Sequence, residues 1–89
     1  MSDAASTGNT AFVNASEEVK TLATKPSTDS LLELYALFKQ SIFGDNTTTK
    51  PGMFDISGKA KWEAWNGKKG MTKEAAQAAY IALVESLKA

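Results

Sequence analysis

Apolar residues along the chain recur every three or four positions, which is the spacing of an α-helix with one buried face. The first such series consists of Phe12, Ala15, Val19 and Leu22. It predicts a helix over about residues 10–23. Pro26 ends this helix, because proline disfavours the helical conformation of the residue before it.

A second apolar series predicts a helix that ends at Gly44. Its start stays open, because Ser27, Thr28 or Asp29 could serve as its N-cap. Residues 44–55 then form a polar loop that is long for a compact bundle. Loops of this length are often functional.

Two more helices complete the predicted fold. Asp55 can cap a helix over about residues 56–69, and Thr72 can cap a last helix that reaches about residue 88. The alternating pattern of a β-strand is missing, and each helix is too short to be stable alone. The sequence therefore predicts an all-α fold in which the helices bury their apolar faces against one another.

The amino-acid composition argues against most catalytic mechanisms. The 89 residues allow one domain, and they include no cysteine and no histidine. The chain thus has no thiolate nucleophile, and it lacks the commonest general base at neutral pH and the commonest zinc ligand. Its carboxylates show no pairing that suggests acid–base work. We therefore expect a protein that is not an enzyme and that carries no cofactor or metal.

The net charge is zero, but the charges are unevenly distributed. Residues 35–73 hold seven lysines and three acidic residues, a net of +4, whereas the segments before and after are net acidic. A basic centre in a neutral protein suggests a local site for an anion rather than a nucleic-acid surface. The chain also contains no arginine, the residue that most often reads nucleic-acid bases.

Residues 1–9 are small and polar, and we expect a flexible tail there, ahead of a folded domain over residues 10–89. The tail lacks the basic start and the apolar run of a signal peptide. No stretch of the chain approaches the roughly 20 apolar residues that span a bilayer. We therefore expect a cytoplasmic protein without stable membrane insertion.

The second helix carries the most informative surface. Its apolar stripe comprises Leu31, Leu34, Tyr35, Phe38 and Ile42, and it is widened by Leu32, Ala36 and Phe43. Lys39 lies at the edge of this arc, one turn after Tyr35, so a hydroxyl and an ammonium stand beside an apolar surface. An amphiphile with an anionic head would fit such a surface. A central bundle helix buried on two sides, with Lys39 reaching to solvent, is the alternative that the pattern alone favours.

The remaining helices leave similar alternatives open. The third helix places two tryptophans among four lysines, namely Trp62 and Trp65 among Lys59, Lys61, Lys68 and Lys69. An ammonium beside an indole can bind phosphate, but solvated lysines over a buried ring are the simpler interpretation for all except Lys61 and Trp62. Tyr80 on the last helix and Lys20 on the first also have simpler roles, a structural hydrogen bond and surface solvation.

Three blocks of sequence, in this order, resemble the acyl-CoA-binding protein family. They are PSTDSLLELYALFKQ at residues 26–40, PGMFD and GKAKWEAWN within residues 51–66, and AYIA at residues 79–82. The resemblance implies a four-helix up-down-down-up bundle that holds one acyl-CoA. In such a bundle Lys and Tyr side chains grip the 3′-phosphate, an aromatic ring packs on the adenine, and the acyl chain lies in an apolar groove.

The family's ligand positions can be carried over residue by residue. The resemblance places Tyr35, Lys39, Lys61 and Tyr80 at the headgroup, Lys20 near the ligand, and Leu31 and Leu32 near the acyl chain. It completes the set with Ala36 and Leu37. Two positions depart from the family pattern. Phe38 stands where a tyrosine usually packs on the adenine, and Ser57 stands where many members have a lysine.

The resemblance implies a monomeric carrier that binds medium- to long-chain fatty acyl-CoA esters with high affinity. Such a protein forms an intracellular acyl-CoA pool for lipid metabolism. Two other functions stay open. A small helical bundle with tryptophan and lysine on its surface could dock a partner protein, and an enzyme domain that uses acyl-CoA could share the fold, although the composition argues against catalysis.

Overall fold

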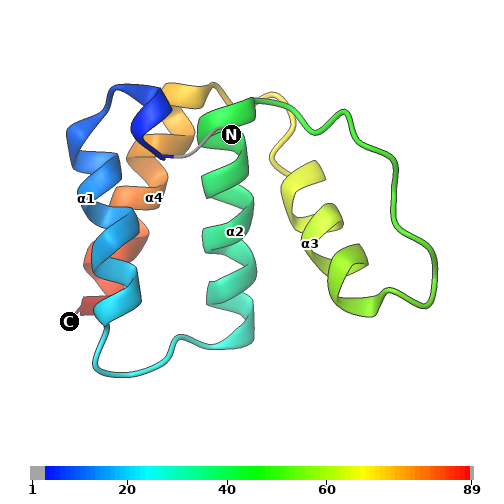
Figure 1. The fold of residues 1–89 in the computed structure, drawn as a ribbon, viewed down its shortest axis with the longest axis horizontal. Helices are drawn as coiled ribbons and strands as arrows, with labels where there is room; N and C mark the ends of the chain where they lie inside the picture. Colours follow the sequence, from blue (N-terminus) through cyan, green and yellow to red (C-terminus); the bar gives the residue numbers. More distant parts are fainter. Residues whose placement is uncertain (1–3, 89) are drawn as a thin grey trace.

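The computed structural model describes residues 4–88 of the chain. Within them it shows α-helices, two short 3-10 helices and no strand (Figure 1). The α-helices are α1 (Thr10–Glu18), α2 (Thr28–Phe43), α3 (Ile56–Asn66) and α4 (Lys73–Lys88), and the 3-10 helices are η1 (Ala4–Thr7) and η2 (Val19–Thr21). The predicted all-α fold is confirmed. None of the described helices combines the length and the apolar character needed to cross a bilayer.

The helix α2 is the centre of the arrangement. It packs against both α4 and α3, while α1 packs against α4. Figure 1 shows α2 and α3 running in one direction and α1 and α4 in the other, which is the predicted up-down-down-up order. The helix α3 therefore stands at the edge of the bundle with α2 as its main neighbour.

Side chains cap the helices where the sequence predicts it. Asp55 and Thr72 cap α3 and α4, and each accepts a hydrogen bond of 3.0 Å from a backbone N–H of the first turn. Among the options for α2, Ser27 is the cap that the structure uses. Gly44 ends α2 with a φ of 78°, a conformation that glycine adopts without strain.

Two helices end earlier than the sequence predicts. The helix α1 ends at Glu18, and the chain then tightens into η2. Turns of 3-10 type are frequent at helix ends, and here the Thr21 hydroxyl donates to the Glu18 carbonyl at 2.9 Å. The helix α3 ends at Asn66, where the chain tightens into turns: the N–H groups of Lys68 and Lys69 donate to the carbonyls three residues back, at 2.9 and 3.2 Å.

Residues 4–7 differ from the flexible tail expected over residues 1–9. They form η1, whose first residue, Ala4, is buried against the core. Asn9 then caps α1 and also donates a hydrogen bond of 2.9 Å to the Gln77 side chain of α4. This contact joins residues far apart in the sequence, so the composition of the segment could not reveal it. The rest of the expected tail, residues 1–3, lies outside the described residues, as does residue 89.

The core lies between α1, α2 and α4 and is built around three aromatic rings. Phe12, Phe38 and Tyr80 form a triangle with centroid distances of 5.0, 5.7 and 5.9 Å. Phe12 and Val84 are completely buried. Each fully buried side chain of this size stabilises the fold by about 1.5–3 kcal/mol through its removal from water. One cluster thus joins three of the helices, each of which is too short to be stable alone.

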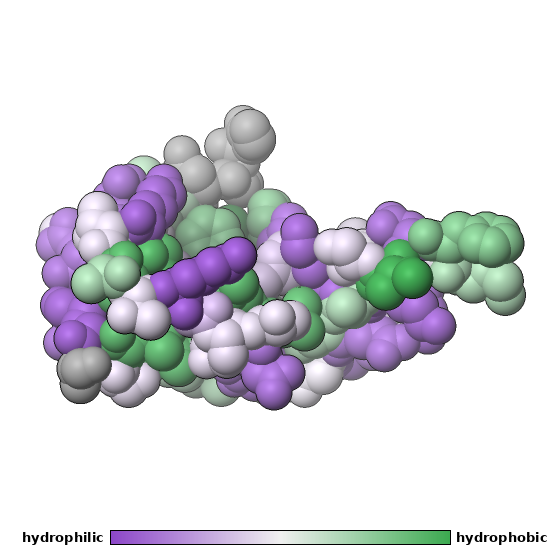
Figure 2. Space-filling model, turned by 90° about the horizontal axis from the view of Figure 1, so that it is seen from below, coloured by the Kyte–Doolittle hydropathy of each residue, from purple (hydrophilic) through white to green (hydrophobic). Residues whose placement is uncertain are grey.

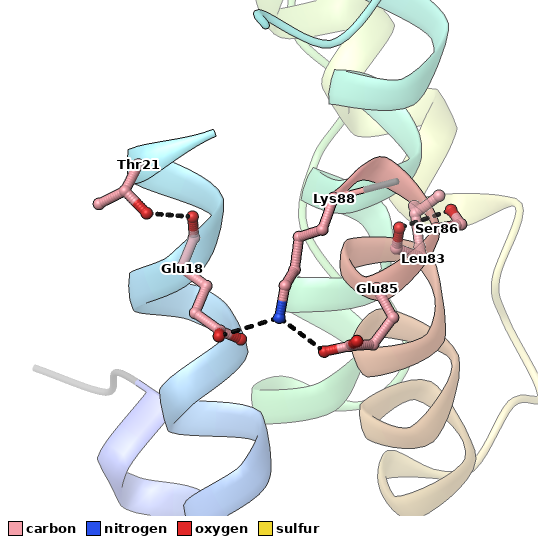
Figure 3. Close-up of polar contacts among 6 residues, drawn as sticks. All are labelled: Glu18, Thr21, Leu83, Glu85, Ser86 and Lys88. Atoms are coloured by element: carbon pink, nitrogen blue, oxygen red, sulfur yellow. Dashed lines mark hydrogen bonds and ion pairs between the residues drawn. The ribbon is translucent and has the colours of Figure 1, made fainter. Parts of the chain in front are cut away.

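A polar contact joins the ends of α1 and α4. Lys88 lies 3.1 Å from a carboxylate oxygen of Glu18 and 3.1 Å from one of Glu85 (Figure 3). The hydrogen bonds to Glu85 and then Glu18 raise the pKa of Lys88 above its ordinary value. All of these side chains are substantially exposed, so water and salt screen the attraction and it adds little stability.

Candidate functional site

A cavity of about 290 Å³ opens between α2, α3 and the loop over residues 44–55. We call it the α2–α3 pocket. Its wall consists of Tyr35, Lys39, Thr48, Thr49, Pro51, Gly58, Lys61, Trp62 and Trp65. Three of the predicted headgroup residues, Tyr35, Lys39 and Lys61, are therefore brought together in one wall.

Two lysine ammoniums approach one tyrosine ring at this pocket. Lys61 Nζ lies 5.6 Å from the ring centroid of Tyr35, and Lys39 Nζ lies 5.8 Å from it. Lys39 Nζ is also 4.8 Å from the ring of Phe43 and 5.4 Å from that of Trp65. Aromatic rings attract a cation but do not neutralise its charge. Within the described part of the chain neither lysine forms an ion pair, so both charges are available to an anion.

Two indole N–H groups hold α3 and the preceding loop in place. Trp65 Nε1 donates to the Gly44 carbonyl at 2.9 Å, and Trp62 Nε1 donates to the Thr48 carbonyl at 3.0 Å. These bonds tie the loop to α3, which itself packs against α2. Lys61 directly precedes Trp62 on α3, so the helix that carries this lysine is the one that the two indole bonds hold.

Two other lysines of the basic segment already have partners. Lys68 pairs with Glu33 of α2, and Lys50 pairs with Glu63 at 3.0 Å. The hydrogen bond from Lys50 is the main reason why the pKa of Glu63 lies below its ordinary value. The structure thus separates lysines that are neutralised on the surface from the two that line the pocket.

A second cavity, of about 390 Å³, lies beside α1, and we call it the α1 pocket. Its wall consists of Ala4, Ala5, Val13, Ser16, Glu17, Val19, Lys20, Phe38 and Tyr80. Burial raises the pKa of Tyr80, so its phenol stays protonated and can donate a hydrogen bond at neutral pH. The Lys20 ammonium lies 4.0 Å from Glu17 with both side chains largely exposed, a contact too weak to fix it.

The two pockets lie next to one another along α2. Tyr35 lines one and Phe38 lines the other, and residues three apart on a helix are neighbours on its surface. The predicted headgroup residues are divided between the pockets, with Lys20, Phe38 and Tyr80 in the α1 pocket. An extended ligand that crosses this stretch of α2 can contact both groups.

The remaining predicted residues line neither pocket. Leu31 is 40 % exposed and Leu32 is half-buried near the start of α2, and Ser57 is exposed near the start of α3. Ala36 and Leu37 are 0 % and 2 % exposed. The structure thus places both side chains in the interior, away from the two pockets. Their assignment to the site stays a prediction.

The sequence analysis did not identify the loop residues that line the α2–α3 pocket. Thr48, Thr49 and Pro51 line the pocket, although none of them is charged or aromatic. Only the length of the loop indicated a functional role, and length indicates the segment as a whole rather than individual residues. Trp65 was interpreted as a core residue, and it is 7 % exposed, yet one side of it also lines the pocket.

The chemistry of the two pockets suits an anionic amphiphile. Ammonium groups and a protonated phenol can bind phosphate, while indole, phenyl and proline surfaces offer apolar contact. Within residues 4–88, no cluster of His, Cys, Asp or Glu side chains is arranged to hold a metal ion.

The chain resembles known proteins over most of its length. The family model described as acyl CoA binding protein matches residues 9–84. The acyl-CoA-binding protein homolog 1 of Caenorhabditis elegans is 66 % identical over 76 residues, which cover 85 % of this chain and 88 % of that protein. The acyl-CoA-binding protein of Saccharomyces cerevisiae is 53 % identical over 76 residues, covering 85 % and 87 %.

Solved structures show the same fold. The crystal structure of Oryza sativa acyl-CoA-binding protein 2 matches with a TM-score of 0.83 at 40 % identity, covering 86 % of each chain. The solution structure of the yeast acyl coenzyme A binding protein matches with a TM-score of 0.70 at 51 % identity, covering 88 % of this chain and 91 % of that one. This chain therefore belongs to the acyl-CoA-binding protein family.

Proposed function

We propose that this protein binds medium- to long-chain fatty acyl-CoA esters with high affinity and serves as an intracellular acyl-CoA carrier and pool former in lipid metabolism. The observation that carries the proposal is that two ammoniums, Lys39 and Lys61, which form no ion pair among the described residues, both lie within 6 Å of the Tyr35 ring centroid, at 5.8 and 5.6 Å. The relatives named acyl-CoA-binding proteins support the same ligand class.

Both pockets take part in binding the CoA headgroup in this proposal. Lys39, Lys61 and the Tyr35 hydroxyl bind phosphate in the α2–α3 pocket. In the α1 pocket the Phe38 ring packs on the adenine, and Tyr80 and Lys20 add polar contacts. Each phosphate contact is a charge-assisted hydrogen bond, which is about twice as strong as a neutral one.

The acyl chain follows the apolar surface near the start of α2, where Leu31 and Leu32 lie. Leu31 is 40 % exposed, so it can bury area against an acyl chain without any change in the fold. Ser57 lies on the adjoining start of α3 and offers a hydroxyl in place of the usual ammonium.

The binding free energies show why the CoA headgroup and the acyl chain are both required. Removing a palmitoyl chain from water is worth about 12 kcal/mol at about 0.8 kcal/mol per methylene. Association costs roughly 4–15 kcal/mol, so the chain alone gives weak to moderate affinity. Two or three charge-assisted hydrogen bonds of about 1.5–3 kcal/mol each then bring the dissociation constant toward the nanomolar range. The phosphate contacts give selectivity for the CoA ester over the free fatty acid.

The test is calorimetric titration of palmitoyl-CoA into Lys61→Ala, with Lys59→Ala as the matched control. Both lysines are on α3, but only Lys61 lines the α2–α3 pocket. We expect the Kd of Lys61→Ala to rise at least about tenfold, as for a lost charge-assisted bond, and that of Lys59→Ala to stay unchanged. Equal Kd values for the two variants, or equal affinity of the wild type for palmitate and palmitoyl-CoA, would contradict the site.

We further propose that the protein is a cytoplasmic monomer that acts by binding and not by catalysis. The chain offers no cysteine or histidine for acyl transfer, and its relatives are named for binding. A thioesterase assay with palmitoyl-CoA tests this part of the proposal. Native mass spectrometry of the protein purified from cells tests the carrier role against a protein-docking role, since only a carrier retains the mass of an acyl-CoA.

A further inference from the structure

The chain segment at the start of α3 projects three large apolar side chains into solvent. Met53, Phe54 and Ile56 are 74 %, 93 % and 78 % exposed, and we call these three residues the tip. Figure 2 shows hydrophobic atoms gathered on a projection at one end of the molecule. Single exposed apolar residues are common, but adjacent large ones on a projecting end mark an interaction surface.

Local hydrogen bonds fix the backbone around the tip. The Asp55 N–H donates to the Gly52 carbonyl at 3.0 Å, and the Asp55 carboxylate accepts from the Gly58 N–H at 3.0 Å. The Lys59 N–H donates to the Asp55 carbonyl at 2.9 Å. The apolar side chains are thus presented by a hydrogen-bonded turn and the first turn of a helix, so little conformational entropy is lost when they are buried.

The surroundings of the tip are basic. Residues 50–61, which bracket the tip, contain three lysines and one acidic residue, a net of +2. Lys50 pairs with Glu63, which leaves Lys59 and Lys61 of α3 without an ion pair among the described residues. An apolar projection surrounded by lysines is complementary to a surface that is anionic outside and apolar a short distance inside.

We propose that the tip docks this protein onto phospholipid bilayers that contain anionic lipid. Met53, Phe54 and Ile56 enter the boundary between headgroups and acyl chains, and lysines of α3 lie against the anionic headgroups. The docking is shallow and reversible, because three side chains bury far less apolar area than a membrane anchor does.

Docking would also bring the α2–α3 pocket to the membrane. Pro51 and Gly58, which flank the tip in the sequence, both line that pocket. If the pocket binds acyl-CoA, as the proposed function holds, the ligand could pass between bilayer and protein without crossing bulk water. This step rests on the proposed function, whereas the docking itself does not.

Flotation with ligand-free lipid vesicles tests the apolar part of the proposal. The vesicles are a three-to-one mixture of phosphatidylcholine and phosphatidylserine, and the protein is the full chain. We expect the wild type to float with them, and the double variant Phe54→Ser with Ile56→Ser to lose at least about tenfold in partition. Phe54→Leu keeps an apolar tip and is expected to float like the wild type.

Two charge-reversal variants test the contribution of the lysines to docking. Lys59→Glu lies next to the tip, whereas Lys73→Glu changes the same charge where α4 begins, at the other end of α3 (Figure 1). We expect Lys59→Glu to weaken binding to the mixed vesicles several-fold and Lys73→Glu to leave it unchanged. The effect of Lys59→Glu should disappear on vesicles of phosphatidylcholine alone.

The proposal is overturned if the wild type does not float with the mixed vesicles or if the double serine variant floats equally well. It is also overturned if sedimentation equilibrium shows a dimer that the double variant abolishes, since the tip would then contact a second copy. Palmitoyl-CoA titration of the double variant separates the two proposals. An unchanged Kd is expected, and a wild type that fails to bind palmitoyl-CoA would defeat the proposed function while leaving the vesicle result to decide the docking.

Discussion

Lys39 and Lys61 owe their available charges to the residues around them. The wall of the α2–α3 pocket contains phenol, indole, hydroxyl and proline groups but no carboxylate. An ammonium beside aromatic rings keeps its full charge, whereas Lys50 beside Glu63 is largely compensated. The identity of the neighbouring side chains, and not the number of lysines, therefore determines where an anion can bind.

Tyr35→Phe is expected to weaken palmitoyl-CoA binding while the fold stays intact. The substitution removes the hydroxyl but keeps the ring beside Lys39 and Lys61. A hydrogen bond to an ionised phosphate contributes about 1.5–3 kcal/mol, so the Kd should rise about tenfold to hundredfold. Calorimetry measures the Kd, and urea unfolding provides the control. A Kd equal to that of the wild type would show that the hydroxyl does not contact the ligand.

The sequence predicts the position of some pocket residues much better than that of others. Lys39 could be placed beside Tyr35 because both lie on one helix, one turn apart. Lys61 could be placed there only through the family resemblance, since its approach to Tyr35 depends on how α3 packs against α2. Ala36 and Leu37 lie in the same sequence block as real pocket residues, but a helix turns successive side chains to different faces, and these two face the interior.

At the scale of elements, local signals placed the helices, the starts of α3 and α4 and the end of α2, whereas the ends of α1 and α3 depended on the turns that follow them. Caps such as Asp55 and Thr72 act within one turn, so the sequence shows them directly. The turn after α3 is held instead by a contact between distant residues, because the Gly70 N–H donates to the Asp45 carboxylate at 2.8 Å. That bond is the main reason why the pKa of Asp45 lies below its ordinary value.

The two tryptophans of α3 are expected to differ in how much they stabilise the molecule. Trp65→Phe removes a donor from the Gly44 carbonyl at a position that is 7 % exposed, and should cost about 2 kcal/mol or more. Trp62→Phe removes the bond to the Thr48 carbonyl, but water can replace that partner at the surface, so the loss should stay below about 1 kcal/mol. Urea unfolding of both variants measures the difference. Equal losses would show that α3 is not held mainly through Trp65.

At the scale of the whole molecule, the protein combines a compact core with an edge that is open to ligands. The core joins α1, α2 and α4, whereas α3 contacts mainly α2 and carries both one wall of a pocket and the tip. The tip and the α3 wall of the α2–α3 pocket thus lie outside the core, whereas Phe38 and Tyr80 belong both to the core and to the α1 pocket.

Two phenylalanines at opposite extremes of burial test this separation. Phe12→Ala empties a completely buried position and should destabilise the protein by about 3–5 kcal/mol, a large part of the roughly 5–15 kcal/mol typical of a domain. Phe54→Ala, at a position 93 % exposed, should change the free energy of unfolding by less than about 0.5 kcal/mol. Denaturant titration of both variants measures the contrast. A loss of stability at Phe54 comparable to that at Phe12 would show that the tip packs against the bundle.

The most direct test of the central claim is an NMR titration of the isotope-labelled protein with palmitoyl-CoA. The account predicts saturable shifts of the backbone amides of Tyr35, Lys39 and Lys61, with smaller shifts at Phe38 and Tyr80. The amide resonances of Glu85 and Lys88 near the end of α4, which line neither pocket, should not shift. Shifts confined to the ends of α1 and α4, or no shift at saturating ligand, would contradict binding through the two lysines beside Tyr35.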